Sequence, residues 1–83
     1  MDTTLIVNLI GWLGSAAVVG AYALISTHRV KGDSLLYQLL NLIGSIFLIV
    51  NTVYLGAFPS AFVNTIWVAI AVFALWRIVR KAR

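Results

Sequence analysis

Carboxamide side chains recur inside long apolar stretches of this sequence, and the chemistry they offer is neutral hydrogen bonding. Residues 34–55 contain no charged side chain but include Gln38, Asn41 and Asn51. At helical spacing Gln38 and Asn41 share one face, which Asn51 flanks. An unpaired amide is costly in hydrocarbon. We therefore expect this face to contact protein or a hydrated cavity.

The first apolar stretch carries a similar face. Asn8, Trp12 and Ser15 group on one side of a helix over residues 5–26. Gly11 and Ser15 form a small-xxx-small pair, which predicts close approach of a second helix.

Acid–base, nucleophilic and metal chemistry lack the residues they need. Up to Trp76, the apolar stretches contain no Asp, Glu, Lys, Arg or His, and their Ser and Thr residues have no neighbouring base. His28 is the single histidine, whereas a metal site needs several ligands. We predict a protein that is not an enzyme and that has no metal site and no cofactor.

Composition indicates one small integral membrane domain, residues 1–83. The chain has 83 residues, of which 63% are hydrophobic and 10% charged. It has no cysteine, so no disulfide can stabilise a soluble fold of this short length. The net charge of +4 does not indicate nucleic acid binding, because the basic residues lie beside apolar helices.

Three transmembrane helices account for nearly the whole chain in an all-α bundle. A signal peptide cleaved after Ala23 is the alternative for the first helix, but no Lys or Arg precedes the apolar stretch. We expect Asp33 or Ser34 to cap the second helix, and Pro59 to lie in the first turn of the third. The expected boundaries are a first span at 5–26, a loop at 27–33, a second span at 34–55, an outer loop at 56–59, a third span at 60–79 and a basic tail at 80–83.

The positive charges predict the orientation. All six Lys and Arg residues lie either in the first loop or from position 77 to the C-terminal end, and three spans place these two regions on the same side of a membrane. The positive-inside rule then puts the N-terminus outside and the C-terminus in the cytoplasm. These residues are expected to contact anionic lipid headgroups, and they are Arg29, Lys31, Arg77, Arg80, Lys81 and Arg83.

Polar faces on all three helices predict a second copy. Asn64 and Trp67 align on the third helix, as the amides do on the others. One alternative is that each amide simply joins helices. The other is that two copies enclose a shared cavity, and because the number of spans is odd, such a homodimer is parallel.

The chain resembles the bacterial SemiSWEET half-transporters of the PQ-loop (MtN3-like) superfamily from Ser34 to Asn64. The matching features are Gly32-x-Ser34 after a basic loop, Gly44, and Pro59-x-x-x-x-Asn64. The resemblance implies a three-helix half-transporter that forms dimers and moves sugars in the bacterial inner membrane. It also implies that Asn64 lines the central pocket.

The sequence departs from that family at two places. Residues 18–23 lack the Pro-Gln pair of the first helix, and Gly20 is the candidate hinge in its place. The second-helix Trp and Tyr of the family, of which the Trp packs against the substrate, align with Leu48 and Asn51 here. Trp67 or Trp12 is therefore the candidate aromatic residue for packing against the solute.

Two functional hypotheses follow. The first is a homodimeric facilitator that passes a small neutral solute, a sugar or a similar compound, by alternating access. The second is a membrane scaffold or a small subunit of a membrane complex that transports nothing; a lipid-modifying enzyme ranks third. The candidate solute-binding residues are Asn64, Trp67, Asn41, Leu48, Asn51, Trp12, Ser15 and Gln38.

Overall fold

Three long helices make up the described part of the protein. The computed structural model describes residues 2–82. Helix α1 spans Thr3–Ser26, α2 spans Leu35–Tyr54 and α3 spans Phe58–Ala82. Each is long and apolar enough to cross a membrane. The prediction of an all-α protein with three potential membrane-spanning helices is confirmed for the described residues.

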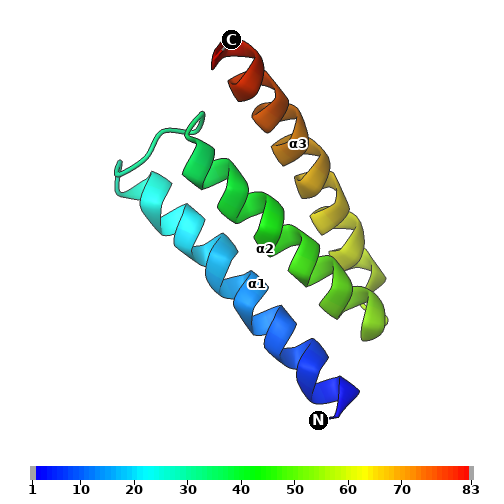
Figure 1. Cartoon of the computed structure of the whole chain (residues 1–83). Helices are drawn as coiled ribbons and strands as arrows, with labels where there is room; N and C mark the ends of the chain where they lie inside the picture. The colour runs from blue at the N-terminus through cyan, green and yellow to red at the C-terminus, as the bar shows by residue number, and fades with distance from the viewer. Residues whose placement is uncertain (1, 83) are drawn as a thin grey trace.

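Helix α2 lies between the other two (Figure 1). It packs against both α1 and α3, whereas over residues 2–82 no Cα atom of α1 lies within 8 Å of one in α3. Figure 1 shows α3 diverging from α2 toward the C-terminus, and the two termini lie at opposite ends of the molecule. A single copy is therefore an open row of helices rather than a closed bundle.

Side-chain caps begin the first two helices. The Asp2 carboxylate accepts a hydrogen bond from the Thr4 N–H at 3.2 Å, and the Ser34 hydroxyl accepts one from the Tyr37 N–H at 3.2 Å. Of the two candidate caps for α2, Ser34 is the one used. Each bond satisfies an N–H that has no partner within the helix.

Left-handed residues end the same two helices. After α2, the Gly56 N–H donates to Val53 O at 3.1 Å and the Ala57 N–H donates to Thr52 O at 2.7 Å. This is a Schellman motif, and Gly56 has the positive φ of 74° that it requires. After α1 the same conformation falls on His28, with φ 59°, a position that glycine occupies at lower cost.

Glycines bring α1 and α2 into close contact. A Cβ atom on Gly14 would lie 2.8 Å from the Gly44 carbonyl oxygen, and one on Gly44 would lie 2.9 Å from the Gly14 carbonyl oxygen. The sequence predicted close approach at Gly11 and Ser15, and the prediction is confirmed at Gly11, where a Cβ atom would lie 2.6 Å from Asn51 Cγ of α2. Gly11 is buried but Ser15 is only half-buried, and the closest approach of the two backbones lies at Gly14, three positions after Gly11.

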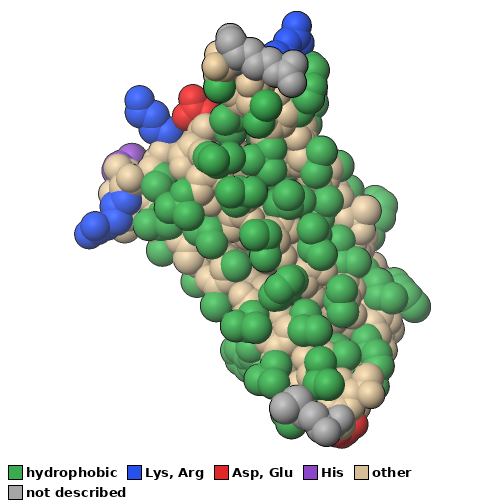
Figure 2. Space-filling model, in the orientation of Figure 1, with side chains coloured by type: hydrophobic (Ala, Val, Ile, Leu, Met, Phe, Trp, Pro, Cys, Tyr) green, Lys and Arg blue, Asp and Glu red, His purple; other side chains and the backbone are tan. Residues whose placement is uncertain are grey.

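The buried positions carry small side chains, and the exterior is apolar. The buried apolar residues are Val7, Ala21, Ala61 and Ala71; Ser45 is also fully buried, and its Oγ has no hydrogen-bond partner among the described residues. Figure 2 shows hydrophobic side chains along the length of the molecule, with Lys and Arg gathered at one end. Such a surface suits lipid rather than water. The molecule measures 44 × 23 × 23 Å, and its length matches a bilayer with its headgroup layers, about 40–45 Å.

Candidate functional site

A small open groove lies between α2 and α3, with a volume of about 130 Å³. Positions 37, 38 and 41 follow one another around adjacent turns of α2, and positions 67, 70 and 71 do the same on α3. Neighbouring side chains of the two helices therefore meet across the groove. Its lining residues are Tyr37, Gln38, Asn41, Trp67, Ile70 and Ala71.

The two amides of the groove are anchored to the backbone. The Asn41 Nδ2 donates to Tyr37 O at 3.1 Å, and the Gln38 Nε2 donates to Gly32 O at 2.8 Å. Each bond uses one of the two N–H groups of an amide, which also carries an acceptor oxygen. Both side chains therefore retain hydrogen-bonding capacity while their orientation is held.

Aromatic rings and a small residue complete the groove. Trp67 is 47% exposed, and Tyr37 is half-buried on the opposite wall. Ala71 is only 2% exposed, so its small side chain lets α3 lie close to α2. Apolar and aromatic walls with a few oriented polar groups are the usual construction of a small-molecule site. Over residues 2–82, no group of three or more His, Cys, Asp or Glu side chains is placed to hold a metal ion.

Asn51 lies on the other side of α2, against α1. Its Nδ2 donates to the Val7 carbonyl oxygen at 3.0 Å, and its side chain fills the space beside Gly11, where a Cβ atom would lie 2.6 Å from Asn51 Cγ. Leu48 also faces α1, since its Cγ would lie 3.2 Å from a Cβ on Gly14. Neither residue lines the groove.

The remaining candidates are distributed over α1 and α3. Asn64 is half-buried one turn before Trp67, and its Nδ2 donates to Ser60 O at 3.0 Å. Trp12 is 77% exposed on α1, and Ser15 is half-buried on the same helix. In one copy the structure thus brings together three of the eight candidates, Gln38, Asn41 and Trp67.

Three groove residues were not among the candidates from the sequence. Ile70 and Ala71 lie three and four positions after Trp67 on α3, and Tyr37 lies four before Asn41 on α2. Helical spacing from the nominated residues was the signal that could have found them. The candidate hinge Gly20 lies within the regular helix α1, and a Cβ atom there would meet nothing within 4 Å.

Comparison with known protein families gives one match. A protein-family model matches residues 7–83. The chain belongs to this family. Its description carries no function, and no curated protein and no solved structure matches the chain. The family match covers the groove and most of the described structure.

The matched region also includes the basic residues expected at lipid headgroups. Arg29 and Lys31 are exposed in the loop after α1, and the cations near the end of α3 are exposed as well. The Arg80 guanidinium lies 5.1 Å from the centre of the Trp76 ring, a cation–π geometry. Arg83 lies outside the described residues.

Proposed function

We propose that this protein is a SemiSWEET-like half-transporter, a homodimeric facilitator of a small neutral solute by alternating access in the bacterial inner membrane. The supporting observation is the groove between α2 and α3, where Gln38 and Asn41 face Trp67. Amides that donate and accept hydrogen bonds beside an aromatic ring suit a solute with hydroxyl groups and an apolar face, such as a sugar or polyol.

The charge distribution supports a neutral cargo that moves down its own gradient. The groove residues are uncharged, and the apolar part of each helix holds no carboxylate or histidine that relays protons. Proton-coupled transport generally uses such groups. Asn64, one turn from Trp67, is the residue that the family resemblance adds to the pocket.

The open arrangement of the helices supports a pair of copies. Because α1 and α3 do not approach each other within the described residues, a groove along α2 stays open in one copy. A second copy, inserted in the same direction, closes that side and brings a second set of polar faces to a shared axis. Trp12 and Ser15 on the exposed side of α1 are then candidates for the cavity wall.

Flux measurements test the proposal directly. We expect purified protein in liposomes to equilibrate at least one compound of a sugar, polyol and amino-acid panel. Asn41→Leu and Trp67→Ala should each lower the rate about tenfold, the cost of one lost hydrogen bond or stacking contact with the solute. Asn64→Ala should lower it as well.

The control is Thr65→Val, which removes a hydroxyl that donates to Ala61 O within α3 and that does not line the groove. Its flux should match the unmodified protein. Absence of flux for every compound, or rates unchanged in Asn41→Leu and Asn64→Ala, would overturn the proposal.

A scaffold or subunit role is the second candidate, and the hydrogen bonds of the amides favour it. Asn51 donates across the interface of α2 with α1, which is how an amide joins membrane helices. Asn41 and Asn64 donate to carbonyls of their own helices, so all three amides have a partner within one chain without a solute. Purification from native membranes decides between the two. One protein recovered repeatedly in equal amount with this chain, together with absence of flux, supports the scaffold.

A further inference from the structure

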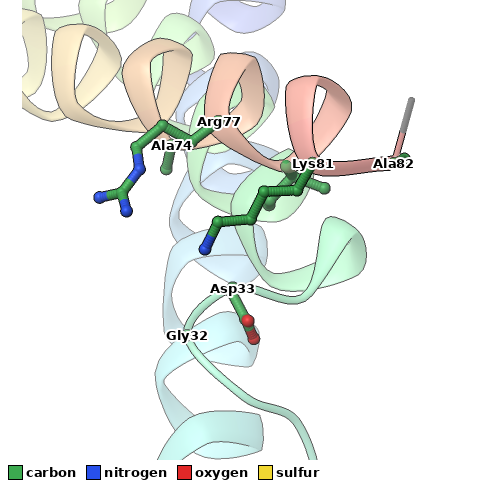
Figure 3. A pocket seen from close by; sticks show the side chains of 7 residues that line it. Gly32, Asp33, Ala74, Arg77, Lys81 and Ala82 are labelled. Atoms are coloured by element: carbon green, nitrogen blue, oxygen red, sulfur yellow. The ribbon is translucent and has the colours of Figure 1, made fainter.

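A second, larger cavity lies at the charged end of the molecule. It has a volume of about 500 Å³ and forms where α3 diverges from α2 (Figures 1 and 3). One wall is the loop that precedes α2 and the other is the last turns of α3. The lining residues are Gly32, Asp33, Ala74, Arg77, Ile78, Lys81 and Ala82.

Both signs of charge line this cavity. Arg77 and Lys81 are four residues apart on α3, so they project from the same side of the helix. Figure 3 shows Arg77 and Lys81 extending from α3, with the Lys81 amine near the loop at Asp33, whose carboxylate extends away from α3. A carboxylate does not favour the binding of a simple anion, because Asp33 repels the negative charge that Arg77 and Lys81 attract.

We infer that the cavity binds a phospholipid headgroup that carries both a phosphate and a primary ammonium group, that is, phosphoethanolamine. Arg77 and Lys81 hold the phosphate, since guanidinium and ammonium groups form charge-assisted hydrogen bonds with its oxygens. The Asp33 side chain is exposed, so it can turn about its Cα–Cβ bond toward the cavity and accept hydrogen bonds from the ligand ammonium, which has three N–H donors. The apolar side chains of Ala74 and Ile78 lie beside the start of the acyl chains.

The position of the cavity agrees with this ligand. It lies at the end where Lys and Arg gather, next to the apolar exterior (Figure 2), which is the depth of a lipid headgroup. The bound headgroup joins the loop before α2 to the end of α3, where the two helices are farthest apart. This site differs from the general attraction of a basic tail for anionic lipid, because it selects for N–H groups rather than for net charge. It does not depend on whether the protein transports a solute.

Lipid retention measured by native mass spectrometry tests the site. Delipidated protein in detergent is mixed with equal amounts of phosphatidylethanolamine, phosphatidylcholine and phosphatidylglycerol with identical acyl chains. Choline has no N–H, so phosphatidylethanolamine should be retained about tenfold over phosphatidylcholine, the effect of one charge-assisted hydrogen bond. Equal retention of the two would overturn the proposal.

Four variants assign the contacts. Asp33→Asn should abolish the preference for ethanolamine over choline and raise retention of phosphatidylglycerol, and Arg77→Gln should lower retention of all three lipids. Arg80→Gln is the matched cation control, because Arg80 lies over Trp76 and does not line the cavity. Asp2→Asn is the matched carboxylate control at the opposite end of the molecule. Both controls should keep the preference.

Two further results keep the test decisive. Helical circular dichroism should be the same in all variants, so that Asp33→Asn with intact helices and an unchanged lipid preference would overturn the assignment. Inorganic phosphate in large excess should leave the ethanolamine preference in place. If phosphate displaces phosphatidylethanolamine completely, the cavity is a free-phosphate site and the lipid assignment is wrong.

Discussion

At the residue scale, Asn51 is an amide that joins two helices. Its Nδ2 donates to Val7 O at 3.0 Å across the interface of α2 with α1. Hydrogen bonds between membrane helices contribute about 1 kcal/mol. We predict that Asn51→Ala lowers the free energy of unfolding in micelles by about that amount, as measured by reversible denaturation with sodium dodecyl sulfate.

The matched control for Asn51 is Asn41→Ala. The Asn41 Nδ2 donates to Tyr37 O within its own helix, and that carbonyl also takes part in the helix backbone. The loss of stability should therefore be clearly smaller. Equal losses in the two variants would show that the bond to Val7 is not what distinguishes Asn51.

At the scale of elements, the interface between α1 and α2 depends on two glycines. Gly14 and Gly44 each lie where a Cβ atom would come within 3 Å of a backbone oxygen of the other helix. Backbone does not rotate away as a side chain does, so an added methyl group must separate the helices. We predict that Gly14→Ala and Gly44→Ala each destabilise the protein by roughly 1–3 kcal/mol.

Gly20→Ala is the control for this pair. It adds the same methyl group to α1 where nothing lies within 4 Å, and alanine favours a helix over glycine. Its stability should be unchanged or slightly raised in the same denaturation assay. A loss equal to that of Gly14→Ala would refute the close-contact explanation.

The helices themselves were predictable from the sequence, because each contains a long uncharged apolar run. Ser34 was a visible N-cap and Gly56 a visible helix end. The left-handed turn at His28 was not visible, since no glycine marks it. There the hydrogen bonds of the chain reversal impose a conformation that the residue itself does not favour.

The pairing of faces was the part that the sequence did not determine. Helical periodicity places Asn41 and Asn51 on adjacent faces of α2, but it does not say which neighbouring helix each residue contacts. In the structure α2 lies between the other two helices. Asn41 therefore faces α3, and Asn51 faces α1. The groove was therefore predicted only in part, through Gln38, Asn41 and Trp67.

At the scale of the whole molecule, charge is separated along the long axis. The described Lys and Arg residues lie in the loop after α1 and at the end of α3, which share one end of the molecule (Figure 2). Asp2 and the short connection from α2 to α3 lie toward the other end. Since positive charge is retained in the cytoplasm, this asymmetry alone should orient the protein in the membrane.

Cysteine labelling measures that orientation, and the chain has no cysteine of its own to interfere. Leu55→Cys marks the uncharged end and Thr27→Cys the charged end; both positions are exposed. A membrane-impermeant maleimide should label Leu55→Cys in intact spheroplasts and label Thr27→Cys only after permeabilisation. Labelling of both in intact cells would mean that copies insert in both directions. The pair would then be antiparallel, and the shared cavity proposed for two copies inserted alike would not form.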